Sequence, residues 1–418
     1  MAILPRIPLL VALLAAAPAA RAQPDSAFPL HDGDRVVFYG DSITQDGAYG
    51  RLVEEYARTR FPRLRLKFYN AGVGGDRVDG GGAGKIGVRL ERDVVALHPT
   101  VVTIMLGMND GSYRAPDKEI RERFAAGYRA IVDQLERELP GVRIYLILPS
   151  PFDDISRPPD FLPGYDHVLR QLGEDVAAIA ADHHLPTIDF GGPLNDGLAQ
   201  VMAADPALAR MLLPDRVHPS PSGHLVLGAV LLRAWHAPGL VSRVEIDGRT
   251  HAVVAAEQAT VTDLKAEALN LSWTELEQAL PLPLNFADST VSLAELAKAG
   301  LDDLDREDLK VTGLPEGRYA LRIDDGLAGT FTAAELGKGI NLARYNTPMR
   351  GQAFPTLWAT DGGHQIQLVR RDLLAHGPEG PEAAAAAQVL ASWDDRNQAA
   401  RSPADVPKPH AFLLARMP

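Results

Sequence analysis

The 418-residue chain is predicted to contain an α/β domain whose parallel sheet is covered by helices on both faces. Two observations lead to this prediction. Short apolar runs of strand length alternate along the chain with segments whose apolar residues recur at helical spacing. The runs are also nearly continuous, whereas a strand with one face in water alternates between apolar and polar residues. The length leaves room for a second domain.

Five runs are candidates for strands, and they lie at residues 35–39, 64–69, 100–106, 142–148 and 185–190. Helices are expected at residues 49–61, 120–139, 164–184 and 222–235. In the second of these, Ile120, Phe124 and Tyr128 fall on one apolar face. Functional residues of such sheets lie in the loops at the carboxyl ends of the strands.

The first 22 residues have the composition of a signal peptide. Arg6 provides a positive charge, and residues 7–17 form an apolar stretch that is too short to span a bilayer. Ala20 and Ala22 stand at the small-residue positions of a cleavage site, which places the mature start near Gln23. An uncleaved membrane anchor is the alternative. We therefore expect an exported protein, periplasmic or extracellular, without stable membrane insertion.

The composition excludes several classes of partner and site. The formal net charge of −12 argues against nucleic acid and anionic membrane surfaces, since both repel an acidic protein. The chain has no cysteine, which excludes disulfides, thiolate metal sites and a cysteine nucleophile. Export without disulfides is more typical of a bacterial periplasm or medium than of a eukaryotic secretory route.

Four short motifs lie where a site is expected in this fold. Their sequences are GDSIT at 40–44, NAGVGGD at 70–76, GMND at 107–110 and DRVHP at 215–219. The first three directly follow the first three predicted strands, and the fourth precedes the last predicted helix. Since the carboxyl ends of parallel strands lie at one edge of a sheet, the motifs are expected to meet there.

These motifs contain every group that acyl transfer by a serine requires. Ser42 is the candidate nucleophile, His218 the base that takes its proton, and Asp215 the carboxylate that orients the histidine. The oxyanion of the tetrahedral intermediate needs preorganised donors. The candidates are the backbone N–H groups of Ser42 and Gly75 and the side-chain amide of Asn109. A glycine would let the backbone approach the reacting carbon closely.

The four motifs resemble the consensus blocks of the SGNH (GDSL) hydrolases over roughly residues 33–237. The resemblance places the oxyanion glycine of that family at Gly75, with Gly74 as the alternative. It implies a three-layer α/β/α domain at residues 28–237 with a five-stranded parallel sheet of flavodoxin-like type. It also implies no metal or other cofactor, and esterase, lipase, thioesterase or carbohydrate-deacetylase activity.

Taken singly, each motif also has a structural interpretation. Residues 40–44 fit an ordinary strand-to-helix turn with a serine cap, and residues 107–110 fit a simple loop. Asp215 and His218 would then be a helix cap and a surface histidine. All four motifs in this order, each at a predicted strand end or helix start, favour the catalytic interpretation.

Other motifs point to weaker alternatives. Residues 80–85 resemble a phosphate-binding loop, but Asp79 and Ile86 stand where that loop has Gly and Ser or Thr. The Asp-His-His sequence at 182–184 could ligate a metal, but it ends a predicted helix, where histidine interacts favourably with the helix dipole. The chain lacks a Gly-x-Ser-x-Gly elbow, which argues against an α/β-hydrolase.

Residues 239–400 are expected to form a second region of mixed β and helical character whose role is unknown. Two hairpins are predicted, the first with strands at 244–246 and 250–254 and the second at 309–311 and 319–323. Helices are predicted at 332–343 and 382–393. Residues 401–418 contain several prolines and are predicted to be an extended tail.

The favoured substrate is an acetyl or other short-chain ester of a carbohydrate. Export favours polysaccharide over acyl-CoA, and the chain lacks a basic amphipathic helix of the kind that binds lipid interfaces. A lipase, lysophospholipase or thioesterase of the same fold is one alternative. A polysaccharide-binding protein with marginal catalysis is another. Its sugar-stacking residues would be aromatics that otherwise belong to a core, namely Trp273, Tyr319, Tyr345, Phe354 and Trp358.

Overall fold

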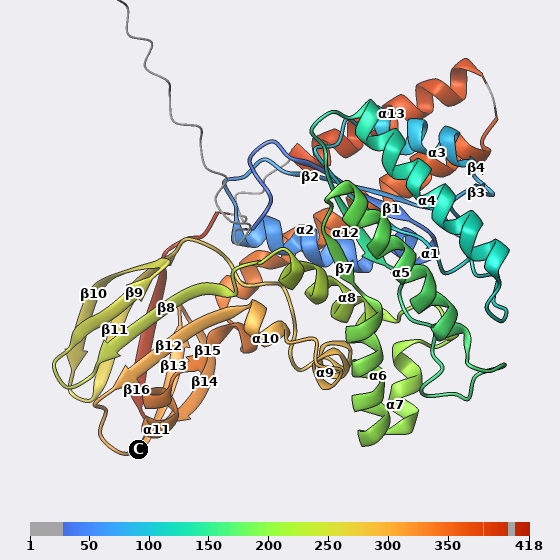
Figure 1. The fold of residues 1–418 in the computed structure, drawn as a ribbon. Coiled ribbons are helices and arrows are strands. Elements are labelled where there is room, and N and C mark those ends of the chain that lie inside the picture. The colour runs from blue at the N-terminus through green and yellow to red at the C-terminus, as the bar shows by residue number, and fades with distance from the viewer. Residues whose placement is uncertain (1–27, 379, 400–405) are drawn as a thin grey trace, which may run out of the picture.

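The computed structural model describes residues 28–378, 380–399 and 406–418, so the predicted signal peptide lies outside the described residues. Its centre is a five-stranded parallel sheet with the strand order β2-β1-β5-β6-β7 (Figure 1). The strands are β1 (Arg35–Gly40), β2 (Lys67–Gly72), β5 (Val101–Met105), β6 (Arg143–Leu148) and β7 (Thr187–Asp189). All five strands predicted from apolar runs are present.

Helices cover both faces of this sheet, because alternate residues of each strand point into different cores. Val36 and Phe38 of β1 pack in one core with residues of α2 (Ala48–Arg60) and α8 (Pro221–Ala234). Val37 and Tyr39 pack in the other with residues of three further helices, α3 (Ile86–Asp93), α4 (Lys118–Glu138) and α5 (Tyr165–His183). The predicted three-layer α/β/α fold is confirmed.

Shorter elements complete this domain. They are α1 (Ser42–Asp46), β3 (Gly80–Gly81), β4 (Gly84–Lys85), a 3₁₀ turn at Val95–Leu97, α6 (Gly191–Ala204) and α7 (Pro206–Leu212). In the part of the chain that the structure describes, no helix is long and apolar enough to cross a membrane.

Two further sheets form the C-terminal β region (Figure 1). One has the order β15-β12-β8-β9, with β8 (Leu240–Asp247), β9 (Ala252–Glu257), β12 (Arg306–Thr312) and β15 (Ile340–Asn341). The other has the order β10-β11-β16-β13-β14, with β10 (Ala259–Glu267), β11 (Asn270–Glu277), β13 (Arg318–Ile323), β14 (Gly326–Thr332) and β16 (His410–Arg416). Helices α9 (Ser289–Leu296), α10 (Leu301–Leu304) and α11 (Ala333–Lys338) and a 3₁₀ turn at Leu342–Arg344 connect the strands.

One predicted hairpin is confirmed and the other is wrong. β8 and β9 pair antiparallel, and Asp247 closes the turn by accepting hydrogen bonds from the backbone N–H groups of Arg249 and Thr250. β12 and β13, by contrast, lie in different sheets: β12 pairs parallel with β8, and β13 pairs with β14 and β16. The turn between them carries the chain from one sheet to the other, which local sequence does not distinguish from a hairpin.

The prediction of a proline-rich tail at 401–418 is also wrong for the residues that the structure describes. β16 lies between β11 and β13 and pairs antiparallel with both. Phe412 and Leu414 are buried, whereas Leu413 is exposed, which is the period of two that a strand requires. The strand directly follows several prolines, and these prolines favour the prediction of a tail over that of a strand.

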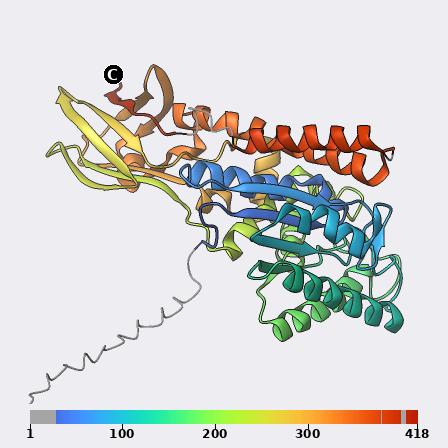
Figure 2. The ribbon, with the colours of Figure 1, turned by 90° about the horizontal axis from the view of Figure 1, so that it is seen from above.

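The helical hairpin α12 (Pro348–His376) and α13 (Pro381–Ala399) leaves the C-terminal β region and returns to the parallel sheet. Figure 2 shows both helices side by side along one side of the α/β domain, next to α2 and β2. The helix predicted at 382–393 corresponds to α13. The 29-residue α12 was not predicted, since Pro355 and several glycines interrupt its pattern.

Candidate active site

Ser42 is the first residue of α1, directly after β1. Asp41 caps this helix, since its Oδ1 accepts a hydrogen bond of 3.0 Å from the N–H of Ile43. The Asp41 side chain is buried, and burial raises the pKa of its carboxyl to about 7. The capping interaction fixes the turn that presents the Ser42 hydroxyl at the carboxyl edge of the sheet.

The three residues predicted to form a relay are in hydrogen-bond contact. The Nε2 atom of His218 lies 2.8 Å from the Oγ of Ser42, and its Nδ1 lies 2.6 Å from Oδ2 of Asp215. The other carboxylate oxygen of Asp215 accepts backbone N–H bonds from His218 (2.7 Å) and Val217 (3.0 Å). Partial burial alone would raise the pKa of Asp215, but these hydrogen bonds outweigh it and hold the pKa below its usual value.

The loop that carries Asp215 and His218 is held by Arg216, a residue of the fourth motif for which the sequence pattern predicts no role. Arg216 has φ +76°, a left-handed conformation that is unfavourable for a residue with a side chain. Its guanidinium donates to the carbonyl of Pro158 (2.9 Å) and lies 5.5 Å from the ring centroid of Phe152. Its own carbonyl accepts from the N–H of Asp153 (3.0 Å). Only the folded β6–α5 loop supplies these partners.

The second motif forms the loop after β2, and the two glycines in it differ. Gly75 has φ +72°, and a Cβ built there would meet no atom within 4 Å. The backbone therefore requires glycine for its conformation, and crowding within the protein is not the reason. The N–H of Gly74 already donates to Oε1 of Gln45 at 2.5 Å. This favours Gly75 over Gly74 as the donor to an oxyanion.

Asn109 lies beside this loop. Its Nδ2 donates to the carbonyl of Asp76 (3.0 Å), which leaves the second hydrogen of the amide for another acceptor. The hydroxyl of Tyr113 lies 3.4 Å from Oδ1 of Asn109, and the Tyr113 ring stacks on Tyr165 with a centroid distance of 4.8 Å. Tyr113 has φ +53° and a half-exposed side chain, so strained backbone lies next to the candidate oxyanion donors. Sequence patterns gave no signal for Tyr113.

Buried charges fix the loop from within. Arg89 of α3 is fully buried and donates to Oδ2 of Asp76 at 3.0 and 2.8 Å and to the carbonyl of Ala71 at 3.1 Å. Asp110, next to Asn109, accepts from the N–H of Val78 at 3.0 Å, and burial raises the pKa of its carboxyl to about 7. The second and third motifs are therefore tied to each other and to α3.

The aromatic residues that are candidates for sugar stacking differ in their exposure to solvent. Trp273 and Tyr319 are buried in the core of the C-terminal β region, so their rings do not face solvent. Tyr345 and Phe354 are half-buried, and Trp358 on α12 is 70% exposed.

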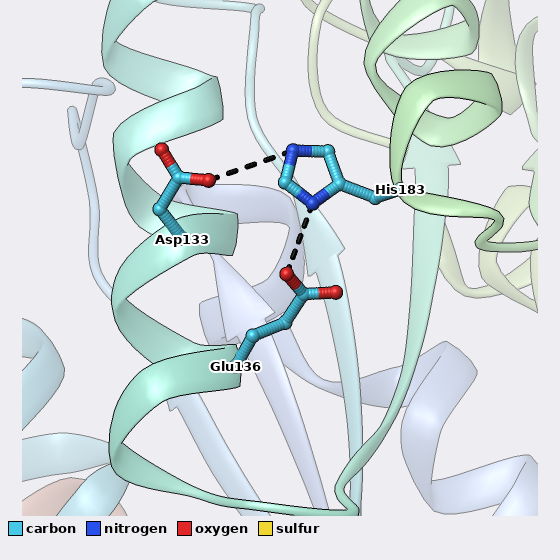
Figure 3. Close-up of side chains that lie close together, drawn as sticks. All are labelled: Asp133, Glu136 and His183. Carbon is cyan, nitrogen blue, oxygen red and sulfur yellow. Dashed lines mark hydrogen bonds and ion pairs between the residues drawn. The ribbon is translucent and has the colours of Figure 1, made fainter.

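His183, a candidate metal ligand in the sequence, has acidic neighbours from a different helix. His183 lies near Asp133 and Glu136 of α4, as Figure 3 shows, with Nδ1 3.0 Å from Glu136 and Nε2 3.6 Å from Asp133. Asp182 instead pairs with Arg129 at 2.6 Å. This cluster lies at the opposite end of the 19-residue α5 from Tyr165, about 27 Å along the helix axis, so it is remote from Ser42.

Comparisons with known proteins identify a family and several relatives. A model of the GDSL-like lipase/acylhydrolase family matches residues 38–226. An acetylxylan esterase of Geobacillus stearothermophilus is 28% identical over 225 residues, which are 48% of this chain and 93% of the relative. The solved structure of a gut microbial diltiazem-metabolizing enzyme has a TM-score of 0.80 and 26% sequence identity, covering 94% of this chain and 100% of its own. Residues 38–226 therefore form a GDSL-like lipase/acylhydrolase domain, and this domain supports an SGNH-type esterase activity.

Proposed function

We propose that this esterase removes acetyl groups from carbohydrate through an acyl-enzyme on Ser42, with His218 and Asp215 as its relay. The hydrogen-bonded chain from Ser42 Oγ through His218 to Asp215 is the observation that supports the mechanism most directly. The acetylxylan esterase among the relatives supports the choice of substrate.

In the first half of the reaction, Nε2 of His218 takes the proton of the Ser42 hydroxyl as Oγ attacks the acetyl carbonyl. The carbonyl oxygen becomes an oxyanion, and the N–H groups of Ser42 and Gly75 and the amide of Asn109 donate to it. The bond to the sugar oxygen then breaks, and His218 returns the proton to that oxygen. The sugar leaves with a free hydroxyl, and Ser42 carries the acetyl group.

In the second half, a water molecule gives its proton to His218 and attacks the acetyl-serine. The tetrahedral intermediate collapses, His218 protonates Oγ of Ser42, and acetic acid leaves and loses its proton to solvent as acetate. In both halves the imidazole is transiently a cation. Asp215 stabilises that cation because its lowered pKa keeps it ionised at neutral pH.

We also propose that residues 1–22 direct export, which would bring the enzyme to extracellular or periplasmic polysaccharide. A second candidate substrate class is small, non-carbohydrate esters, because the structural relative that covers 94% of the chain is a diltiazem-metabolizing enzyme. Both candidates use the same relay and differ only in the alcohol that leaves.

The experiment compares three esters as substrates of the purified protein: acetylated xylooligosaccharides, p-nitrophenyl acetate and a long-chain p-nitrophenyl ester. Release of acetate from the oligosaccharide with a higher kcat/KM than from p-nitrophenyl acetate is expected. A preference for the long acyl chain would refute the short-acyl proposal. Hydrolysis of p-nitrophenyl acetate without deacetylation of the oligosaccharides would instead favour small non-carbohydrate esters. Ser42→Ala serves as the control for contaminating esterases.

A further inference from the structure

We propose that Gln367 and Arg371 of α12 are positioning residues for the oxyanion loop, defined as residues 73–75, and that the C-terminal helical hairpin thereby takes part in catalysis. The proposal rests on the mechanism proposed above. Both residues lie outside the matched domain at 38–226 and act on it from the distant end of the chain.

β2 is an edge strand of the parallel sheet. In the described part of the chain, no further strand pairs with its outer edge. An open edge presents unpaired backbone groups that need partners. Side chains of the hairpin supply them. Gln398 of α13 accepts from the N–H of Phe68 (2.6 Å) and donates to its carbonyl (2.8 Å).

Further along the same edge, α12 takes over. Gln367 accepts from the N–H of Asn70 (2.8 Å) and donates to the carbonyl of Phe68 (2.9 Å). Arg371, one helical turn later, donates to the carbonyl of Gly72, the last residue of the strand. Phe68, Asn70 and Gly72 alternate along β2, so their backbone groups point to the same edge.

The end of β2 sets the position of the oxyanion loop. A Cβ on Gly72 would lie 2.2 Å from the N of Gln45 in α1, so the strand touches the helix that begins with Ser42. Asn70 joins the two elements as well, because its Nδ2 donates to the carbonyl of Thr44 (2.5 Å) and its Oδ1 accepts from the N–H of Gly72 (2.9 Å). Gln367 therefore contacts Asn70, in addition to Phe68, and Arg371 contacts Gly72.

Two buried arginines therefore hold consecutive carbonyls at this strand end. Arg89 of α3 holds Ala71, and Arg371 of α12 holds Gly72. Arg371 is only 6% exposed, and a charge-assisted hydrogen bond in such a place is stronger than a neutral one. A shift of Gly72 would move the Gly75 N–H relative to Ser42. Because the oxyanion exists only in the transition state, such a shift should lower kcat and leave KM nearly unchanged.

The test uses p-nitrophenyl acetate, so that it does not depend on the natural alcohol. Arg371→Met keeps most of the side-chain volume and removes the donor, and we expect kcat to fall about 10-fold, below the ~10²-fold cost of a 1 Å misplacement. Arg371→Lys keeps one donor and should recover much of that loss. The matched control is Gln398→Ala, which removes buried hydrogen bonds to Phe68, four residues before Gly72. This variant should lower the melting temperature to a similar extent but keep kcat within about twofold of the wild-type value.

A purely structural role of the hairpin predicts a different result. Arg371→Met and Gln398→Ala would then have the same kcat at temperatures well below melting, and that outcome would overturn the proposal. If Arg371→Met does not fold, Gln367→Met provides the same comparison, and an unchanged kcat there would also overturn it. Failure of the proposed mechanism is distinct, because then the wild-type protein would be inactive or Ser42→Ala would retain activity.

Discussion

Asp215, the carboxylate of the proposed relay, and the carboxylates between the two C-terminal sheets have pKa values shifted in opposite directions. The Asp215 side chain is 58% exposed, hydrogen-bonded to His218, and has a lowered pKa. Glu275 and Glu277 of β11 and Glu307 of β12 are buried, and we call these three residues the acidic seam. Burial raises the pKa of Glu275 to about 8 and of Glu277 to about 7, and burial with neighbouring carboxylates raises that of Glu307.

The difference shows what each region can do at neutral pH. In the proposed mechanism, Asp215 is ionised when His218 becomes a cation, which is the state that the relay requires. Burial shifts the seam carboxyls toward their protonated form, because the low-dielectric space between the sheets disfavours their charge. Changes at the relay should therefore alter rate and spare stability, whereas changes in the seam should alter the pH dependence of stability and spare rate.

The largest effect is expected at the relay. Ser42→Ala and His218→Ala should each lower kcat by about 10⁶-fold, Asp215→Ala by about 10⁴-fold, and the double variant Ser42→Ala/His218→Ala hardly further. A methyl group cannot form the acyl-enzyme, and Ser and His act as one unit. Steady-state kinetics of p-nitrophenyl acetate and thermal melting are measured together. Additive losses in the double variant would mean that His218 does not act on Ser42.

The next effect is expected at the oxyanion donors. Asn109→Ala should lower kcat by roughly 10²–10³-fold with little change in KM, the usual effect of losing one donor. Asn109→Asp should be at least as harmful, because a carboxylate repels the developing charge. If Asn109 only holds the loop through its bond to Asp76, the Ala variant would melt earlier but turn over normally, and Asn109 would leave the mechanism.

The two neighbouring glycines sharpen the same point. Gly75→Ala should reduce kcat and stability together, because a residue with φ +72° is strained by about 1–2 kcal/mol when it carries a Cβ. Gly74→Ala should be milder, since its Cβ would lie 3.2 Å from the flexible Gln45 side chain. To test this order, the kcat of each variant is measured at the same number of degrees below its own melting temperature. The reverse order would assign the oxyanion N–H to Gly74.

The acidic seam should make the stability of the protein depend on pH. It should not affect the activity of the folded enzyme. The folded-state pKa of Glu275 is raised from 4.5 to about 8, so the folded chain retains a proton that the unfolded chain loses. The stabilising contribution is therefore complete below pH 4.5 and declines as pH rises to about 8. Thermal melting from pH 5 to 8.5 should show this decline, and Glu307→Gln should flatten it.

A matched control for the seam is Glu91→Gln, which changes an exposed carboxylate of α3. It should leave the pH dependence of melting as it is in the wild-type protein. Equal slopes for Glu307→Gln and Glu91→Gln would contradict the account of the seam. A change in kcat of folded Glu307→Gln would contradict the separation of the two regions.

The smallest effect is expected at the surface cluster of His183, Asp133 and Glu136. His183→Ala removes exposed ion pairs that stabilise a protein by at most about 1 kcal/mol. Its kcat should match the wild type, with and without EDTA in the assay. If EDTA lowered the kcat of the wild-type protein but not that of His183→Ala, the result would indicate a catalytic or structural metal ion in this cluster.

Most of the α/β domain could be predicted from the sequence, because most of its strands and helices have a recognisable local pattern of apolar residues. The central strands β1 and β5 are almost fully buried and are nearly continuous apolar runs, and two of the four motifs lie directly after them. The C-terminal region was read less well. β12 and β13 have the local pattern of a hairpin but belong to separate sheets, and β16 follows a proline-rich stretch although it pairs on both edges.

Chemical type and motif were enough to identify the residues proposed for acyl transfer, which are Ser42, Gly75, Asn109, Asp215 and His218. The contacts that hold these residues in place became visible in the folded protein alone. The partners of Arg216, the stacking of Tyr113 on Tyr165 and the contact of Arg371 with Gly72 join residues that are far apart in the chain. Such contacts leave no periodic signal, because hydrophobic patterns record burial along one element and not which distant side chain meets a backbone carbonyl.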